Sequence, residues 1–185
     1  MNKPSNYFQY RGNGRSLSFR AGFSRTYKNN PEDSLSISSD NITTIYEDYS
    51  GTIWIGTEDG LNKFNPSQRT FTRYAYTVND PQSLSNNQIR GISADDEGFL
   101  WISTYEGGLN RLDPQTETFI NFKNDHNNTS SLSTNRIFSV YQSSDSTLWV
   151  SSYGGGLNKM NKKKGKEEIL CYDKCQIKSP LTVTV

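Results

Sequence analysis

The sequence contains few residues that bind metals or carry out redox chemistry. Of its 185 residues, only two are cysteines and one is a histidine. Cys171 and Cys175 lie four positions apart, but a structural zinc site needs four ligands, and His126 lies far away in an asparagine-rich stretch. We therefore expect free thiols in place of a disulfide or a metal site, and we expect no cofactor.

Long hydrophobic runs and an excess of charge of one sign are also missing. No apolar run approaches the roughly 20 residues that a membrane-spanning helix needs. Residues 1–22 are polar, so the sequence predicts no signal peptide and, taken literally, a cytoplasmic chain. The formal net charge is +1 without a basic stripe, which argues against nucleic acid as a partner. The lysine-rich run at 162–166 is typical of a solvated segment.

A helical period is absent as well, and a much longer period takes its place. No stretch repeats apolar residues every three to four positions for long enough to predict a helix. Instead, Trp54, Trp101 and Trp149 are spaced 47 and 48 residues apart, and Gly-Leu-Asn follows each tryptophan. Ser-Leu-Ser segments at 34–36, 83–85 and 131–133 join one copy to the next. A fixed period in this range is typical of repeat proteins.

Each repeat has the composition of four short strands. In the first copy, β-branched and aromatic residues concentrate at about 41–47, 52–56, 61–64 and 70–76, and turn-forming residues separate these stretches. The first stretch does not alternate cleanly, which fits an inner strand that is buried on both faces. The predicted fold class is all-β: a partial β-propeller made of four-stranded antiparallel blades of about 47–48 residues.

The repeat pattern does not cover the whole chain. Propellers close with about four to eight blades, whereas three copies and a fragment are recognisable here. We therefore expect a piece of a larger protein, or a unit that packs against neighbouring propeller blades or a second copy of the chain. The predicted organisation is an off-pattern N-terminal segment (1–22), the remnant of a preceding blade and its connection (23–36), blade 1 (37–82), blade 2 (83–130), a partial blade 3 (131–161) and an off-pattern lysine-rich tail (162–185).

The repeated string is Asp-x-x-Gly-x-Ile/Leu-Trp-Ile-Gly/Ser-Thr, followed by Gly-Gly-Leu-Asn and Asn/Asp-Pro. Over roughly residues 34–161 it resembles the two-component regulator propeller repeat, although the third copy has Ser143 for the aspartate and Lys162 for the proline. The resemblance implies the periplasmic sensor region of a bacterial two-component protein, commonly a hybrid histidine kinase, that detects glycan fragments. Any kinase activity would then lie outside this chain.

Residues that recur in every copy are interpreted as structural. Large apolar residues at one repeated position are expected to pack between blades, and glycines at one position allow sharp turns. Asp48 and Asp95 follow the first stretch of their copies and are expected to cap the turn there. The residues assigned to the repeat are Trp54, Trp101, Trp149, Gly60, Gly108, Gly156, Leu61, Leu109 and Leu157.

Candidate ligand-binding residues are those that differ between copies on one rim. In a four-stranded meander, the loop between the second and third strands and the connection to the next blade lie at the same end. Tyrosine faces offer stacking area there, and carboxylates and guanidinium groups offer directional hydrogen bonds, as a sugar-binding rim requires. The candidates are Tyr105, Glu106, Tyr153, Asp59, Arg90 and Arg136, with an oligosaccharide as the expected ligand.

The predicted function is a non-catalytic, ligand-sensing module that binds glycan fragments or mediates sensor dimer packing. Two alternatives stay open. A propeller lyase or glycoside hydrolase would need an acidic pair, but nothing singles out such a pair, and a Gly-x-Ser-x-Gly nucleophile motif is absent. A protein-binding scaffold would need no small ligand. We assign no catalytic residue.

Overall fold

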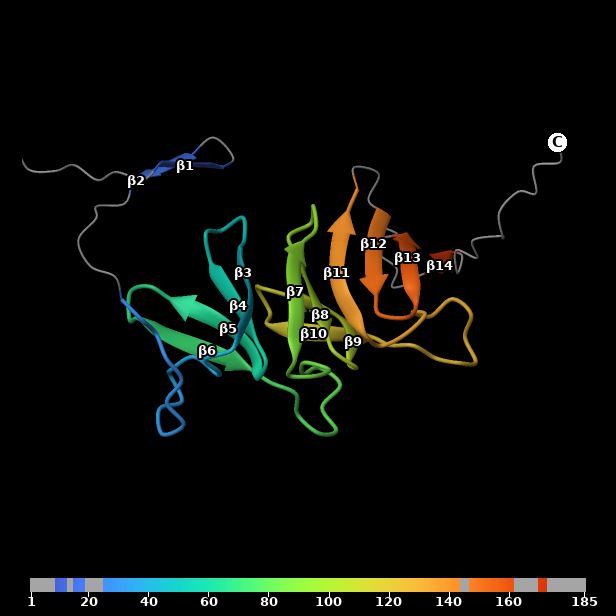
Figure 1. Ribbon diagram of the computed structural model, residues 1–185, viewed down its shortest axis with the longest axis horizontal. Helices are drawn as coiled ribbons and strands as arrows, with labels where there is room; N and C mark the ends of the chain where they lie inside the picture. Colours follow the sequence, from blue (N-terminus) through green and yellow to red (C-terminus); the bar gives the residue numbers. More distant parts are fainter. Residues whose placement is uncertain (1–8, 13–14, 19–24, 144–146, 162–169, 173–185) are drawn as a thin grey trace, which may run out of the picture.

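The computed structural model describes residues 9–12, 15–18, 25–143, 147–161 and 170–172. Within them, every regular element is a β-strand, and none of these segments forms a helix that is long and apolar enough to span a membrane. Three four-stranded sheets stand side by side as blades (Figure 1). The prediction of an all-β partial propeller is therefore confirmed. Cys175 and the lysine-rich run lie outside the described residues.

Each blade is an antiparallel meander in which strand order follows chain order. Blade 1 contains β3 (Ile42–Glu47), β4 (Ile53–Thr57), β5 (Gly60–Asn65) and β6 (Thr70–Tyr74). Blade 2 contains β7 (Ile89–Ala94), β8 (Leu100–Thr104), β9 (Gly108–Asp113) and β10 (Thr118–Phe122). Blade 3 contains β11 (Ile137–Gln142), β12 (Thr147–Ser152), β13 (Gly156–Asn161) and β14 (Leu170–Tyr172). A separate two-stranded sheet contains β1 (Gln9–Gly12) and β2 (Arg15–Ser18).

The fourth strand of blade 3 comes from the segment that the sequence marks as off-pattern. β14 pairs with β13 only at Lys159, Met160 and Asn161. In blades 1 and 2, by contrast, the fourth strand pairs along nearly the whole third strand. The edge of β13 from Gly156 to Asn158 is therefore not paired by β14.

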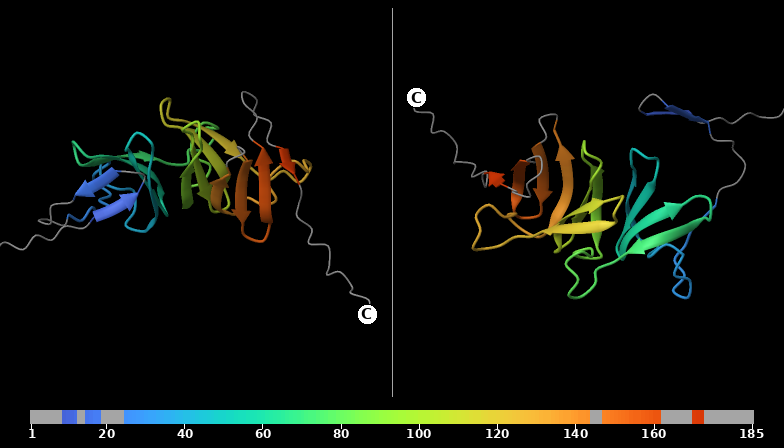
Figure 2. Two further views of the ribbon diagram at one scale, coloured as in Figure 1. Left: turned by 90° about the horizontal axis from the view of Figure 1, so that it is seen from above. Right: turned by 180° about the vertical axis from the view of Figure 1, so that it is seen from behind.

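The inner strands of the three blades share an irregularity. β3, β7 and β11 lie next to one another, and the outer strands fan away from them (Figures 1 and 2). Each inner strand has a register shift after its first residue, which leaves one residue without a partner on the second strand. These extra residues of the β-bulges are Thr43, Arg90 and Phe138. A bulge of this kind redirects a side chain without ending the sheet.

In blades 1 and 2, the turn after the inner strand is capped by an aspartate, as predicted. Asp95 accepts hydrogen bonds from the backbone N–H groups of Glu97 and Phe99, and Trp101 Nε1 donates to its other oxygen at 3.0 Å. Asp48 makes the same set of bonds in blade 1, including one from Trp54 Nε1 at 2.8 Å. The aspartate therefore fixes both the turn and the buried tryptophan of the next strand.

Neighbouring blades share a hydrophobic core. Trp54 and Leu61 of blade 1 pack against blade 2 in one cluster, and Trp101 and Leu109 of blade 2 pack against blade 3 in another. These four side chains are at most 3% exposed, and full burial of each contributes on the order of 1.5–3 kcal/mol. The prediction that these columns pack between blades is confirmed for blades 1 and 2. In blade 3, Leu157 is 47% exposed, because no further blade among the described residues covers that face.

A buried asparagine attaches each connection to the blade that follows it. Asn62, Asn110 and Asn158 of the Gly-Leu-Asn motif are nearly fully buried. Each side-chain oxygen accepts a hydrogen bond from a backbone N–H in the connection, at 2.8–2.9 Å. Each side-chain nitrogen donates to a carbonyl oxygen of the second strand. Buried amides satisfied in this way hold a loop in place at little energetic cost.

These bonds correct the sequence register of the first connection. The donors are Ser38, Ser85 and Ser133, so Ser36-Ile37-Ser38 is the counterpart of Ser83-Leu84-Ser85, and the Ser-Leu-Ser at 34–36 is not. Ile37 is 4% exposed whereas Leu35 is 55% exposed. The Ser-Leu-Ser at 34–36 thus matches the other two connections in sequence only and lies two residues before the structurally equivalent segment.

Candidate functional site

The loops of the blades gather at two ends of the molecule. We call the connection rim the end formed by loops 57–60, 104–108 and 152–156 together with connections 75–88 and 123–136, which form the lower edge in Figure 1. The opposite end, formed by turns 48–52, 95–99 and 113–117, is the turn rim. Because the strands of a meander alternate in direction, the sequence could assign each loop to its rim.

Tyr105 is the centre of a cluster on the connection rim. The guanidinium carbon of Arg90 lies 5.1 Å from the centroid of its ring, and that of Arg136 lies 5.6 Å from it. The backbone N–H of Tyr105 donates to the carbonyl oxygen of Gln88 at 2.9 Å, which fixes the loop that carries the ring. Guanidinium groups at this distance from an aromatic face attract it electrostatically.

The bulge in β7 places Arg90 in this cluster. Ile89 pairs with Thr104 and Gly91 pairs with Ser103, so Arg90 is the extra residue between them. Its Nε is buried and makes no hydrogen bond within the described part of the chain. A buried N–H without an acceptor is costly.

Arg136 and Glu106 form an ion pair across the junction between blades 2 and 3. Arg136 Nη2 lies 2.8 Å from Glu106 Oε1, and both side chains are about half exposed, at 43% and 52%. The hydrogen bond that Arg136 donates to this carboxylate raises the pKa of Arg136. Exposed pairs of this kind contribute little to stability. The pair therefore serves mainly to hold two charged groups in a defined position beside Tyr105.

Of the other two predicted residues, Tyr153 adjoins this group, since its backbone N–H donates to the carbonyl oxygen of Arg136 at 2.9 Å, whereas Asp59 lies at another junction. Tyr153 is 60% exposed, and its ring meets Phe138, the bulge residue of blade 3, edge-on at 6.1 Å. Asp59 accepts a hydrogen bond from Asn87 Nδ2 at 3.0 Å, at the junction of blades 1 and 2. The structure thus brings four predicted residues together, Tyr105, Glu106, Arg90 and Arg136, and leaves their ligand-binding role a prediction.

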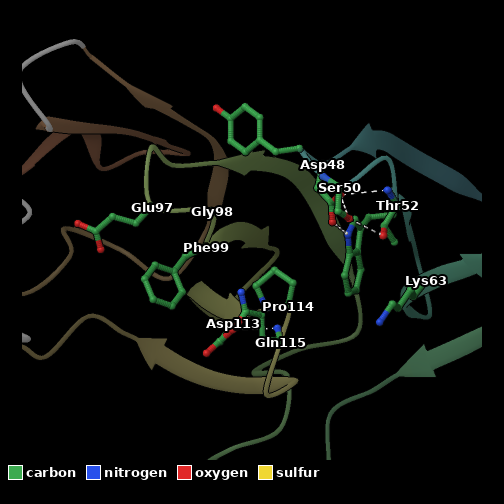
Figure 3. Close-up of a pocket in the computed structure, with 12 residues that line it drawn as sticks. Asp48, Ser50, Thr52, Lys63, Glu97, Gly98, Phe99, Asp113, Pro114 and Gln115 are labelled. Atoms are coloured by element: carbon green, nitrogen blue, oxygen red, sulfur yellow. Dashed lines mark hydrogen bonds between the residues drawn. The ribbon is translucent and has the colours of Figure 1, made fainter.

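A pocket of about 460 Å³ lies between blades 1 and 2 on the turn rim. Figure 3 shows blade 1 residues on one side of it and residues of the blade 2 turns on the other. Sequence reasoning missed this pocket, although the Asp-x-x-Gly and Asp-Pro turns that line it are recognisable and belong to the same end of the meander. The lining residues are Asp48, Tyr49, Ser50, Thr52, Trp54, Lys63, Glu97, Gly98, Phe99, Asp113, Pro114 and Gln115.

The polar groups of this pocket are largely engaged in holding the blades together. Lys63 Nζ lies 2.8 Å from Glu117 Oε1 of blade 2, so it links the two blades. Asp113 accepts the backbone N–H of Gln115, which is the main reason why its pKa is lowered. Asp48 caps its turn, and Trp54, although it lines the pocket, is fully buried. We therefore regard the connection rim as the stronger candidate for binding.

Comparison with known families identifies the repeat. The family model described as two component regulator propeller matches residues 36–59, 83–106 and 131–154. These three stretches contain the inner strand, the turn after it, which an aspartate caps in blades 1 and 2, and the tryptophan strand of each blade. Their starting points agree with the corrected register, in which Ser36, Ser83 and Ser131 are equivalent. None of the curated proteins matches the chain.

Solved structures with a similar arrangement come from B. thetaiotaomicron. The extracellular domain of the hybrid two component system BT3049 is 27% identical with a TM-score of 0.67, over 76% of this chain and 19% of that one. Two structures of the extracellular domain of BT4673, which is described both as a hybrid two component and as a one component system, are 28% and 31% identical with TM-scores of 0.58 and 0.54. They are matched over 80% and 66% of this chain and 20% and 16% of theirs. The chain thus spans at most a fifth of these proteins.

Proposed function

The chain carries three two component regulator propeller repeats, and on this basis we propose that it is a non-catalytic, ligand-sensing part of a bacterial two-component signalling protein. The similar structures are extracellular domains of such systems, which supports a periplasmic location in a longer parent protein. Since the chain spans only a fifth or less of those domains, any kinase or transcriptional output would belong to other parts of the parent.

The proposed ligand is a glycan fragment bound on the connection rim. The observation that carries this proposal is the grouping of Tyr105 with Arg90 and Arg136 within 6 Å of its ring. A half-buried tyrosine provides a flat apolar surface for a sugar ring, and guanidinium N–H groups donate to hydroxyl or carboxylate oxygens. Glu106 would supply an acceptor on the same side.

Binding would be coupled to blade packing because the site draws on two blades. Arg90, Tyr105 and Glu106 belong to blade 2, whereas Arg136 immediately precedes the inner strand of blade 3. A ligand that takes over the hydrogen bonds of the Arg136–Glu106 pair would change the contact between these blades. A conformational signal requires that the ligand bind two arrangements with different affinity.

The test is isothermal titration calorimetry of the chain with a panel of neutral and uronate-containing oligosaccharides. Tyr105→Ala should weaken binding at least about tenfold, which corresponds to the roughly 1.4 kcal/mol of one good stacking contact. Tyr49→Ala on the turn rim is the matched control, because Tyr49 is 76% exposed and far from the cluster, and it should leave binding unchanged. The opposite pattern would move the site to the turn rim. Absence of saturable binding to every oligosaccharide would favour the protein-binding scaffold.

The lyase or hydrolase alternative makes a separate prediction. If Glu106 were a general acid or base, incubation with a bound oligosaccharide would release shorter products, and Glu106→Gln would abolish their release while leaving binding largely intact. Under the sensing proposal, chromatography of the incubated oligosaccharide shows only the starting material for both proteins.

A further inference from the structure

Two blade faces are only partly covered in the described chain, one at each end of the row of blades; on blade 1, Tyr27 covers the outer part of the face, and Phe71 there is 5% exposed. We call the entry face the side of a blade that packs against the preceding blade, and the exit face the side that packs against the following blade. On the entry face of blade 1, Ile42 and Ile45 are 44% and 68% exposed. On the exit face of blade 3, Leu157 and Tyr141 are 47% and 68% exposed, and Trp149 is only half-buried.

The equivalent residues of the internal junctions are buried. Ile89 and Ile137, the counterparts of Ile42, are 0% and 1% exposed. Leu61 and Leu109, the counterparts of Leu157, are both 0% exposed. The exposure at the two ends therefore does not reflect a different design of these blades. Each end face has the composition of a blade–blade interface, and no blade among the described residues packs against it.

The chain itself shows what covers such faces. The exit face of blade 1 meets the entry face of blade 2, and the exit face of blade 2 meets the entry face of blade 3 in the same way. The occupant that fits the exit face of blade 3 is thus an entry face, and blade 1 presents one. We propose that the exit face of blade 3 docks onto the entry face of blade 1 of a second copy of this chain.

The segment before blade 1 is already placed for this contact. Tyr27 packs edge-on against Phe71 at 5.5 Å, as Tyr74 packs against Phe119 of blade 2 at 6.0 Å. Tyr74 is paired in register with Leu61 on β5, and the counterpart of Leu61 is Leu157. In the docked pair, the segment around Tyr27 of one copy would therefore lie beside β13 of the other copy. It would pair there with the part of the β13 edge that β14 leaves unpaired.

Backbone groups match across the same junction. The N–H of Gly60 donates to the carbonyl oxygen of Asn87 in the next blade at 2.7 Å, and that of Gly108 donates to Asn135 at 2.8 Å. The counterparts at the proposed junction are Gly156 as donor and Asp40 as acceptor. Repeat proteins stack through such neighbour contacts, and head-to-tail contacts close a ring when the rotation allows it. Two copies supply six blades, within the range of closed propellers.

One charge pair distinguishes the proposed junction from the junction between blades 1 and 2. Lys63 and Glu117 form an ion pair between blades 1 and 2. Their counterparts across the new junction are Lys159 and Arg69, two positive charges. Arg69 and Glu117 share the same left-handed backbone, with φ of 62° and 57°, so a glutamate fits at position 69. Arg69→Glu should tighten the association by about 2- to 5-fold per junction, the worth of an exposed pair, and less at high salt.

The experiment is sedimentation velocity of the full chain over a concentration series. We expect a reversible dimer that Leu157→Asp and Ile42→Asp each shift to monomer. Val78→Asp is the matched control, because Val78 is 69% exposed in a connection and lies on neither face, and it should leave the dimer intact. Circular dichroism melting of each variant verifies that it is folded. Mixing the two monomeric variants should restore association, because each retains the face that the other has lost.

Three results would overturn the proposal. A folded chain that stays monomeric at every concentration, with Arg69→Glu monomeric as well, would assign the faces to another occupant, such as a further blade of a longer polypeptide. Association that Leu157→Asp abolishes and Ile42→Asp does not affect would indicate pairing of two exit faces. Open-ended oligomers, even if sensitive to both substitutions, would exclude the closed ring of two copies.

Discussion

The first isoleucine of each inner strand should contribute to the free energy of unfolding by an amount that depends on which blade carries it. Ile89 is fully buried in the core between blades 1 and 2, whereas Ile42 occupies the same position in blade 1 with 44% exposure. Truncation of a buried isoleucine to alanine costs about 2–5 kcal/mol, because it removes apolar contact and leaves a cavity. A side chain that is nearly half exposed loses less transfer energy and leaves no closed cavity, so Ile42→Ala should cost about 1 kcal/mol.

Urea unfolding followed by tryptophan fluorescence measures this difference. The protein concentration must be low enough that copies of the chain do not associate, and the dependence on urea should be the same for all variants. Ile137→Ala is the matched control, because Ile137 is 1% exposed in the next junction, and its cost should resemble that of Ile89→Ala. An equal loss for Ile42→Ala and Ile89→Ala in the dilute monomer would refute the reasoning. At concentrations where copies dock, the cost of Ile42→Ala should rise, since docking buries that side chain.

Two further predictions concern the turns. Burial alone would raise the pKa of Asp48, but hydrogen bonds from Ser50 and Trp54 outweigh burial and lower the pKa. The Asp48 carboxylate therefore stabilises the fold fully above the unfolded pKa of about 3.9. This stabilisation is lost as the pH falls through the pKa of the folded state. Urea titrations from about pH 2 to 6 should show a steeper acid loss of stability for the wild type than for Asp48→Asn, and parallel curves would contradict this. Gly108 has φ of 85°, and a Cβ at this position would overlap the carbonyl oxygen of Phe122. Gly98 has a similar φ of 90°, but the space around it is open. Gly108→Ala should therefore lower the free energy of unfolding by more than the roughly 1–2 kcal/mol expected for Gly98→Ala. Equal shifts in melting temperature would show that the close approach is unimportant.

The repeated columns made the fold predictable because each column meets the same surroundings in every blade. Trp54 and Trp101 could be assigned to blade junctions from their spacing alone, and the capping role of Asp48 and Asp95 followed from turn chemistry. The role of Asn62 could not be foreseen. A polar residue after Gly-Leu suggests a turn, and only the folded connection reveals that its amide is buried and bonded to Ser38.

The sequence predicted where the candidate site lies better than it predicted which of its residues contact one another. The sequence grouped Arg90 with Tyr105 and Arg136 at one rim, but it did not predict that Arg90 contacts the Tyr105 ring, because that contact depends on a bulge that leaves no mark in the sequence. Asp59 was grouped with them from its loop alone. Its loop is one residue shorter than that of Tyr105, and its carboxylate is held by Asn87 instead.

The bulge also separates two demands that a repeat protein must meet at once. Stacking of blades requires regularity, whereas recognition of a ligand requires variety. At the bulge, the ladder leaves one residue of each inner strand without a partner, and the three blades carry a hydroxyl (Thr43), a guanidinium (Arg90) and a phenyl group (Phe138) there. The residue type at these positions can therefore differ between blades, while the neighbouring residues that pack between blades stay the same. In a propeller built in this way, the side chains at the bulges can differ from blade to blade while the packing between blades stays the same.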